Sequence, residues 1–259
     1  MTDDTRPVWV LGGGGVTGIA WEVGVLAGLA DEGVTVTPEA VLIGTSSGAV
    51  VGAQIASGTP LAELYERQRQ GVAHETSTAL GLLDLLRLAR AQLFARTPEQ
   101  AARRLGRLAL ATPTPDPSRQ RRTAEARLPD HTWKDADLRI VVVDAESGNS
   151  RTITRHDGVS LVDAVAASCA MPLSSAPVTI DGHRYMDGGM RSTLNLDLAP
   201  ALGETRRVEL LLRDPASRRA QGTNVMDRSV VPALVAAARE QGRREASRVA
   251  AALATTSPS

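Results

Sequence analysis

Residues 41–48 read Val-Leu-Ile-Gly-Thr-Ser-Ser-Gly, a stretch in which three branched aliphatic residues give way at once to small and polar ones. A short apolar run bounded by Gly44 predicts a buried strand. The small residues from Gly48 to Ala56 predict a helix whose face can lie very close to a sheet. The stretch therefore predicts a strand that passes through a tight turn directly into a helix.

The preceding part of the chain has the same organisation. Residues 8–11 form a short apolar run that ends in four consecutive glycines, Gly12 to Gly15. Apolar residues at helical spacing follow over residues 19–30, and Gly33 lies just beyond them to end that helix. Strand, helix, strand and helix in this order predict an α/β fold around a mostly parallel sheet.

The rest of the chain predicts a single domain over residues 1–259 with a long insertion at about 60–130. Residues 60–111 look helical throughout, whereas the proline-rich and arginine-rich residues 112–129 predict an exposed, mobile loop. A C-terminal helix is predicted over about 225–254. Further strands are predicted at 138–143, 151–154 and 208–212, a short helix at 161–168, and a hairpin at 178–185 with Asp181-Gly182 as its turn.

Composition and charge exclude several classes of function. The 259 residues include 29 basic and 29 acidic side chains, so the net charge is zero and nothing favours nucleic acid as a partner. Cys169 is the only cysteine, which excludes an intrachain disulfide and fits a reducing compartment. No stretch approaches the roughly 18 apolar residues that span a bilayer, and the polar N-terminus lacks a signal-peptide pattern. We expect a cytoplasmic protein that contacts membrane only at its surface.

The stretch Gly44-Thr45-Ser46-Ser47-Gly48 matches the nucleophile elbow Gly-x-Ser-x-Gly and lies between a strand and a helix, as that motif requires. Such a turn is too sharp for side chains beside the serine, which explains the two glycines. It would hold the Ser46 hydroxyl at a helix N-terminus, where the helix dipole favours developing negative charge. The simpler interpretation is a Gly/Ser turn in which Ser46 or Ser47 caps the helix.

A glycine-rich loop, Gly12 to Gly18, lies between the first predicted strand and the first predicted helix. Consecutive glycines expose backbone N–H groups, which suits an oxyanion hole beside a nucleophile. The main alternative is a dinucleotide site, because Gly13, Gly15 and Gly18 fit Gly-x-Gly-x-x-Gly. That motif needs an acidic residue at the end of a second strand, whereas Asp31-Glu32-Gly33 is typical of the end of a helix.

The third motif, Asp187-Gly188-Gly189, follows the predicted hairpin. A carboxylate before two glycines is by itself only a turn pattern. In this order, however, the glycine loop, the nucleophile elbow and the Asp-Gly-Gly stretch resemble the patatin-like phospholipase family. The resemblance covers about residues 8–58 and 138–213, and it includes the stretches 167–172 and 185–189.

This resemblance implies a three-layer α/β/α sandwich and a Ser/Asp dyad that works without histidine. It implies Ser46 as the nucleophile and Asp187 as the base, with the backbone N–H groups of Gly13, Gly14 and Gly15 as the oxyanion hole. The remaining motif positions are the glycines that shape the three turns: Gly18, Gly44, Gly48, Gly188 and Gly189.

One residue departs from the family pattern. The family often has Arg or Lys two residues after its third glycine, whereas this chain has Thr17. Because the expected oxyanion donors are backbone groups, ester cleavage survives this change. The change removes a cation that would otherwise act on anionic substrates or on the hole.

The four histidines do not suggest a catalytic triad. His74, His131 and His156 lie in polar, loop-like surroundings and are predicted to be exposed to solvent. His183 is close to the Asp-Gly-Gly motif but lies in the hairpin, across from Ile180, where a packed or edge histidine is expected. No His, Cys, Asp or Glu cluster has the spacing of metal ligands.

The sequence therefore predicts a serine acyl hydrolase that cleaves carboxylic esters of lipids, of the phospholipase A, lysophospholipase or lipid esterase type, without cofactor or metal. One alternative is an esterase or thioesterase that acts on substrates other than phospholipids. Another is a patatin-like binding or regulatory protein without catalysis, and the nucleotide-binding interpretation comes third. The expected partners are a lipid or acyl-ester substrate and the membrane surface, and the sequence indicates no oligomeric state.

Overall fold

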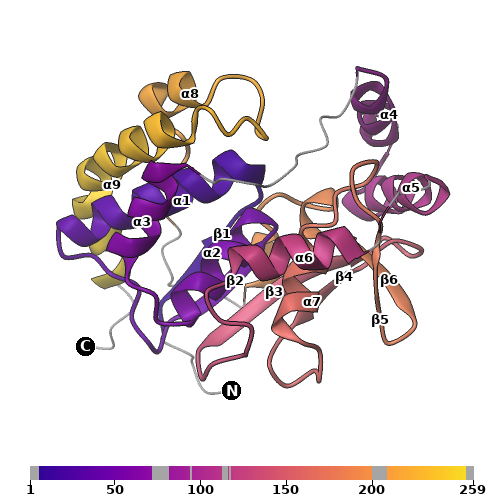
Figure 1. Cartoon of the computed structure of the whole chain (residues 1–259), viewed down its shortest axis with the longest axis horizontal. Coiled ribbons are helices and arrows are strands. Elements are labelled where there is room, and N and C mark those ends of the chain that lie inside the picture. Colours follow the sequence, from indigo (N-terminus) through magenta and orange to yellow (C-terminus); the bar gives the residue numbers. More distant parts are fainter. Residues whose placement is uncertain are drawn as a thin grey trace.

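A sheet built from two distant parts of the chain forms the centre of the protein. The computed structural model describes residues 6–71, 82–93, 95–112, 116, 118–199 and 209–254, and Figure 1 shows how they are arranged. These residues form a six-stranded sheet in the order β1-β2-β3-β6-β5, with β4 also paired to β3. The strands are β1 (Val8–Leu11), β2 (Val41–Thr45), β3 (Asp137–Asp144), β4 (Ser150–Ile153), β5 (Val178–Ile180) and β6 (His183–Asp187).

The strand directions confirm the predicted α/β fold around a mostly parallel sheet. β1, β2 and β3 are parallel, β6 is antiparallel to β3, and β5 is antiparallel to β6. β1, β2, β3 and β5 therefore point the same way, and β4 and β6 point the other way. Along β3, Val141 pairs with Thr45 of β2 and Val142 pairs with Asp187 of β6, so the ends of β2 and β6 lie on either side of one strand.

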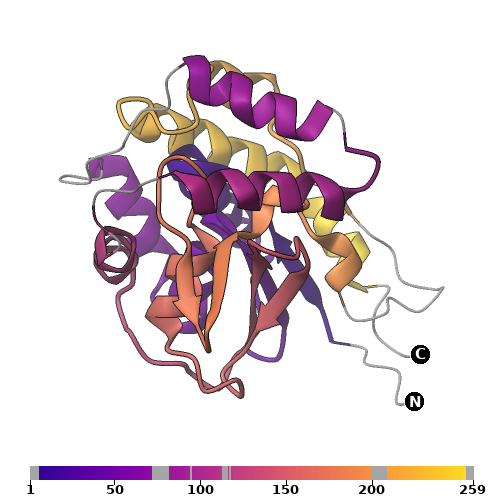
Figure 2. The same cartoon turned by 90° about the vertical axis from the view of Figure 1, so that its right-hand side faces the viewer.

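Helices cover both faces of the sheet, which confirms the three-layer sandwich. The helices are α1 (Gly15–Asp31), α2 (Ser47–Ala56), α3 (Leu61–Gln70), α4 (Leu82–Leu93), α5 (Pro98–Ala111), α6 (Ser118–Arg127), α7 (Leu161–Ser168), α8 (Pro215–Gln221) and α9 (Val231–Ala254), with short 3-10 turns η1 (Gly188–Met190) and η2 (Leu196–Leu198). Leu42 and Ile140 face the layer of α1, α2 and α7. Val143 and Met186 face the opposite layer of α4 and α5, and Figures 1 and 2 show these two helices on the side of the sheet away from α1 and α9.

Glycines let α1 and α9 pack with their backbones almost in contact. A Cβ atom added at Gly28 would lie 2.0 Å from the carbonyl oxygen of Arg239, and one added at Gly242 would lie 2.2 Å from the carbonyl oxygen of Val25. The Arg239 guanidinium also pairs with Asp31 at the end of α1. This close packing fixes the direction of α1, whose N-terminus is the glycine loop.

Gly28→Ala should destabilise the protein, because a methyl group has no room between α1 and α9. We expect a net loss of about 1–3 kcal/mol of unfolding free energy, the usual cost of overpacking, even though alanine is the better helix former. The matched control is Gly52→Ala in α2, whose Cβ would meet only the side-chain ends of Leu138 and Leu11, at 3.0 and 3.7 Å. The control should be neutral or stabilising in urea unfolding, and equal losses in both variants would contradict this account.

The predicted hairpin and helix end are confirmed. Ile180 pairs with His183 across Asp181-Gly182, and these two turn residues have φ values of 52° and 79°. Positive φ at both central residues is the type I′ pattern that a two-residue hairpin favours. At the end of α1, Gly33 has a φ of 82°, which explains why the helix stops there.

The predicted insertion is partly wrong. α3, α4 and α5 lie within residues 60–111, but the helix is not continuous, because Thr97 caps a new helix by accepting a hydrogen bond from the Gln100 N–H. Within the predicted loop over 112–129, residues 118–127 form α6. Pro113, Pro115 and Pro117 precede this helix and Pro129 follows it, so no proline interrupts it. Its first turn is held by the Asp116 carboxylate, which accepts from the Ser118 N–H at 2.9 Å. Residues 72–81, 94, 113–115 and 117 lie outside the described part.

The strand predicted at 208–212 is also wrong over its described residues, 209–212, and residue 208 lies outside them. The segment is extended but pairs with no strand. The buried side chain of Gln241 supplies its hydrogen bonds instead: its amide donates to the carbonyl oxygen of Leu212 at 2.6 Å and accepts from the Asp214 N–H at 3.2 Å. An apolar run predicts an extended backbone well, but its partners depend on tertiary contacts.

Candidate active site

Ser46 lies in a strained turn between β2 and α2. Its φ of 56° and ψ of −113° are values that non-glycine residues rarely adopt. The glycines on either side permit the turn, because a Cβ at Gly44 would lie 2.6 Å from the Ala49 Cα and one at Gly48 would lie 2.1 Å from the Leu11 carbonyl oxygen. Only glycine fits at both positions. The turn that these glycines allow places the Ser46 side chain at the end of the sheet.

Asp187, at the end of β6, is hydrogen-bonded to Ser46 although the two residues are 141 positions apart. The Ser46 Oγ donates to the Asp187 Oδ2 at 2.6 Å, and the Gly189 N–H donates to the Asp187 Oδ1 at 2.7 Å. A Cβ at Gly188 would lie 2.5 Å from the Val141 carbonyl oxygen. The Asp-Gly-Gly stretch therefore turns tightly against β3 and directs the carboxylate toward the serine.

The Asp187 carboxyl is buried, and this changes its acidity. The residue is only 5% exposed. Burial raises the pKa of Asp187 to about 6, although the hydrogen bonds from Ser46 and from the Gly189 N–H act in the opposite direction. A carboxyl with such a pKa is ionised at neutral pH and still basic enough to accept a proton from a hydroxyl in a reaction.

Residues at the C-terminal end of α7 hold both Ser46 and Asp187 in place. The Ser168 hydroxyl accepts from the Ser46 N–H at 2.9 Å and donates to the Val141 carbonyl oxygen at 2.7 Å. The Cys169 thiol donates to the Ser46 carbonyl oxygen at 3.3 Å, and the Asp187 N–H donates to the carbonyl oxygen of the next residue, Ala170, at 2.9 Å. The sequence pattern gave these residues no role, because their partners are more than 15 positions away.

The glycine loop lies directly beside Ser46. A Cβ at Gly13 would lie 3.6 Å from the Ser46 Cβ, and the Gly12 carbonyl oxygen accepts from both the N–H of Gly48 and the hydroxyl of Ser47, at 3.0 and 2.9 Å. The loop is thereby joined to the first turn of α2. A Cβ at Gly18 would lie 2.4 Å from the Ser47 Oγ, so this glycine also permits the close approach of α1 and α2.

The N–H groups of the loop are not equally available. The Gly13 N–H donates to the Thr193 carbonyl oxygen at 2.9 Å. Within the described residues, the N–H groups of Gly14 and Gly15, at the start of α1, donate to no protein acceptor. Gly15 has a φ of 61°. The positive end of α1 therefore presents two free backbone donors beside the serine.

Arg213 supplies a cation beside the loop that the sequence pattern did not predict. A Cβ at Gly14 would lie 2.9 Å from the Arg213 Nη2, so the guanidinium lies against this glycine. It also stacks on the ring of Trp21, with 5.0 Å between its Cζ and the ring centroid. Thr17 is fully buried, and its hydroxyl donates to the Gly14 carbonyl oxygen at 3.2 Å. No signal in the sequence connects a residue after position 200 with a loop at position 14.

The described histidines are not part of this site. His183 lies four positions before Asp187, but its Nδ1 is 3.3 Å from the Asp144 carboxylate and its ring is exposed. His131 and His156 are exposed as predicted, and His74 lies outside the described residues. Within the described part of the chain, no histidine hydrogen-bonds to Ser46 or Asp187.

The acidic residue that a dinucleotide site requires at the end of a second strand is not found there. Asp31 ends α1 instead of a second strand. Its carboxylate is paired with Arg239 and Arg243 of α9, at 2.7 Å in each case. Asp31 therefore stabilises helix packing and is not available to a ribose hydroxyl.

Fold and site together define a three-layer α/β/α protein in which a serine at the turn after the second strand is hydrogen-bonded to a buried aspartate at the end of β6. The chain belongs to the patatin-like phospholipase family, whose model matches residues 9–200. This match includes the glycine loop, Ser46 and Asp187. A search of curated proteins gives no match. Membership in the family supports lipid acyl hydrolysis as the general class of activity.

Asp187→Asn should stabilise the folded protein above pH 6. The folded-state pKa of Asp187 is raised to about 6. Below about pH 4 the carboxyl is protonated in both the folded and the unfolded state, so its burial does not lower the free energy of unfolding. Between pH 4 and pH 6 the unfolded state loses its proton first, and the free energy of unfolding falls. Asparagine has no charge to bury; its one oxygen can accept from the Gly189 N–H, and its amide nitrogen can donate to the Ser46 hydroxyl oxygen. We expect the variant to be more stable by roughly 3 kcal/mol at pH 7.5 and equal to the parent at pH 4. A difference in urea unfolding that does not change with pH would contradict this.

Proposed function

We propose that this protein is a serine acyl hydrolase that cleaves carboxylic esters of lipids, with Ser46 as the nucleophile and Asp187 as the base. The observation that carries the proposal is the 2.6 Å hydrogen bond from the Ser46 hydroxyl to a buried carboxylate whose pKa is raised to about 6. A nucleophile bonded directly to its base needs no histidine between them.

The reaction would proceed in two steps. Asp187 accepts the proton of the Ser46 hydroxyl while the oxygen attacks the ester carbonyl carbon, and the collapse of the tetrahedral intermediate transfers that proton to the leaving alcohol. Water then attacks the acyl-enzyme with Asp187 again as the base, and the protonated carboxyl returns a proton to Ser46. The products are the alcohol and a fatty acid, and no cofactor takes part.

The glycine loop would stabilise the oxyanion in both steps. We propose Gly13, Gly14 and Gly15 as its donors, with different contributions. Among the residues that the structure describes, none accepts from the N–H groups of Gly14 and Gly15, whereas the Gly13 N–H is bonded to Thr193 and contributes only when that bond is released. The nearby N-terminus of α1 adds a positive potential to the site.

Catalysis is favoured over a binding or regulatory role without catalysis. A buried, ionised Asp187 costs roughly 3 kcal/mol of stability at neutral pH, and Ser46 adopts a strained backbone conformation. Binding alone requires neither feature, whereas a nucleophile and its base require both. An esterase or thioesterase acting on substrates other than phospholipids uses the same residues, so the identity of the substrate separates it from a phospholipase.

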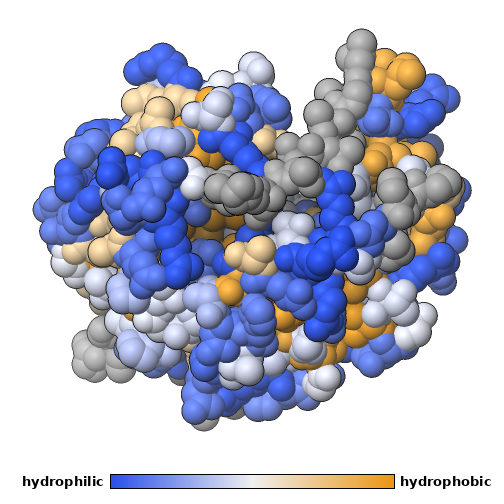
Figure 3. Space-filling view, in the orientation of Figure 1, coloured by the Kyte–Doolittle hydropathy of each residue, from blue (hydrophilic) through white to orange (hydrophobic). Residues whose placement is uncertain are grey.

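Contact with a lipid surface is part of the proposal, and α4 is the element that suits it. Leu83, Leu86 and Leu93 on this helix are 70%, 58% and 77% exposed, and Figure 3 shows apolar side chains where α4 extends from the rest of the protein. No helix in the described residues is long and apolar enough to cross a membrane. We therefore propose peripheral contact, and a cytoplasmic location on the evidence of the single cysteine.

The direct test replaces each proposed catalytic residue. Ser46→Ala should reduce hydrolysis of p-nitrophenyl esters to background and abolish labelling by a fluorophosphonate probe, while circular dichroism remains unchanged. Asp187→Asn should lose nearly all turnover because asparagine cannot accept a proton. The control is His183→Ala, the histidine nearest to Asp187 in sequence, which should retain most activity. If the folded His183→Ala protein were inactive, the mechanism would be a triad and the proposed dyad wrong.

A second test concerns the oxyanion hole. A Cβ at Gly14 would lie 2.8 Å from the Gly18 Cα, so Gly14→Ala must move the backbone that carries the free donors. Loss of one such donor typically lowers kcat by about 10²–10³, with KM little changed because the oxyanion exists only in the transition state. The control is Gly52→Ala in α2, whose Cβ would meet only the side-chain ends of Leu138 and Leu11, at 3.0 and 3.7 Å. An effect of Gly14→Ala on KM alone would indicate a substrate-binding loop instead.

A further inference from the structure

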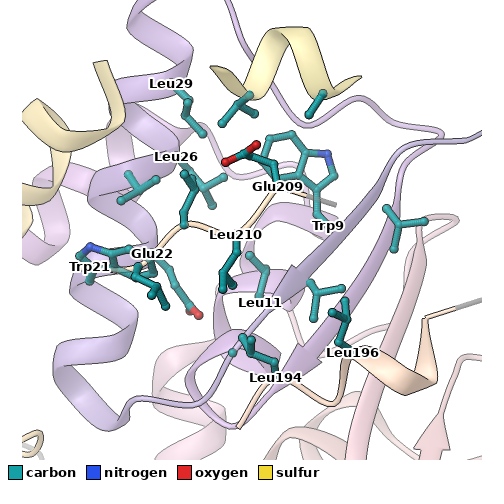
Figure 4. A pocket seen from close by; sticks show the side chains of 18 of the residues that line it. Trp9, Leu11, Trp21, Glu22, Leu26, Leu29, Leu194, Leu196, Glu209 and Leu210 are labelled. Carbon is teal, nitrogen blue, oxygen red and sulfur yellow. The ribbon is translucent and has the colours of Figure 1, made fainter. Parts of the chain in front are cut away.

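An elongated cavity of about 430 Å³ runs beside the edge strand β1, between this strand, α1, α9 and residues 209–213. Its lining includes every residue from Pro7 to Gly13, so it follows the whole of β1 and reaches the glycine loop. In Figure 4, Trp9, Leu29 and Glu209 lie toward one end, and Leu11 and Leu194 lie toward the other. Its volume is within the usual range for small-molecule sites.

The cavity is apolar along most of its length. Leucine and valine side chains from β1, α1 and residues 209–213 form its walls, among them Leu11, Leu26, Leu29 and Leu210. At its far end, Ala252 of α9 lies in the wall, and Glu209 is neutralised by Arg248 at 2.8 Å. A mostly apolar space that runs along a strand suits a flexible hydrocarbon chain better than a compact polar ligand.

The near end of the cavity is polar and lies against the glycine loop. Gly12, Gly13, Glu22 and Arg213 line it, and the Gly12 N–H donates to the Glu22 carboxyl. Gly13 is also the loop residue in contact with Ser46. One residue therefore borders both the cavity and the nucleophile.

The two charged groups at this end do not satisfy each other. The Arg213 Nε and the Glu22 Oε2 are both buried without a hydrogen-bond partner. Burial raises the pKa of Glu22 well above its ordinary value, with only partial compensation from Arg213. The half-buried Arg213 guanidinium keeps an unsatisfied Nε–H, which favours an anionic or strongly polar ligand group.

We propose that this cavity binds a fatty acyl chain, with the carboxyl end at Arg213 and the glycine loop and the tail toward Ala252. The chain is either the acyl group of the ester that Ser46 attacks or the fatty acid that the reaction releases. The proposal deepens the proposed function and rests on it for the source of the chain, but binding itself does not require hydrolysis.

Binding is measured in Ser46→Ala protein, which cannot turn over a substrate. Trp9 and Trp21 line the cavity, whereas Trp133 bonds to Val159 elsewhere in the protein. A bromine-labelled fatty acid should therefore quench part of the tryptophan fluorescence and saturate. Affinity should rise with chain length from octanoic to hexadecanoic acid, because each buried methylene contributes about 0.8 kcal/mol. No saturable quenching at any chain length would overturn the proposal.

A variant that fills the far end tests the direction of the chain. Ala252→Phe should weaken hexadecanoic acid about tenfold, the effect of excluding two methylenes, and leave octanoic acid almost unchanged. The matched control is Ala251→Phe, on the same helix but exposed to solvent, which should affect neither acid. Equal effects of the two variants, or of the two chain lengths, would contradict the proposed orientation.

The near end is tested separately with Arg213→Gln, which removes the charge and retains hydrogen-bond donors. This variant should weaken dodecanoic acid by about tenfold or more, the value of a charge-assisted hydrogen bond, and leave dodecanol almost unaffected. Equal loss for the acid and the alcohol would contradict a role for the charge.

Ester hydrolysis by protein that retains Ser46 shows whether the bound acyl chain belongs to the substrate or to the released acid. If Ala252→Phe shifts the preference among p-nitrophenyl esters toward shorter chains, the cavity holds the acyl group of the substrate. If only fatty acid binding changes, it holds the released acid. Protein that binds fatty acids but labels with no fluorophosphonate and cleaves no ester would refute the proposed function and leave the cavity proposal standing.

Discussion

The site depends on one close contact between backbones, that of Gly48 at the start of α2 with the carbonyl oxygen of Leu11 at the end of β1. At a distance of 2.1 Å from the position of a Cβ, this contact excludes every side chain. It brings the turn that carries Ser46 against the loop that begins at Gly12, and two hydrogen bonds to the Gly12 carbonyl oxygen hold the two segments together. Ser46 and the glycine loop are thus positioned by main chain, which side-chain motion cannot disturb.

Ser46 and Asp187, the two proposed catalytic residues, both lower the stability of the folded protein. The strained Ser46 backbone and the buried Asp187 charge both oppose folding. The surrounding structure offsets them through rigid contacts, namely the Ser168 bridge between Ser46 and β3 and the bond from the Asp187 N–H to Ala170. A site of this kind persists only in a well-packed domain, and the close packing of α1 on α9 has that role here.

Local patterns in the sequence predicted most of the fold, because apolar runs and glycine turns depend on neighbouring residues. The pairing of Ser46 with Asp187 was instead implied by the family resemblance that the three motifs carry, and the two side chains are hydrogen-bonded. α6 was missed because the preceding prolines, including Pro113 and Pro117, were given more weight than the helix-forming residues after them. Periodicity carries no information about contacts between residues far apart in the sequence. The positions of Arg213 and Ser168 in the site, and the lack of a strand at 209–212, depend on such contacts. The division into a single domain over residues 1–259 stays a prediction.

The segment before Arg213 also determines how the interior of the protein can be reached. Strand β1 is the edge of the sheet, and its open side is covered by residues 209–213, which Gln241 fastens through the Leu212 carbonyl oxygen and the Asp214 N–H. Detaching this segment breaks its hydrogen bonds to Gln241, the Glu209–Arg248 ion pair and the stacking of Arg213 on Trp21, and it leaves the strand ladder intact. Amide hydrogen exchange should therefore be much faster here than in β2, because this opening is local and of low free energy. Such an opening would give the proposed acyl chain access beside the sheet while the protein remains folded.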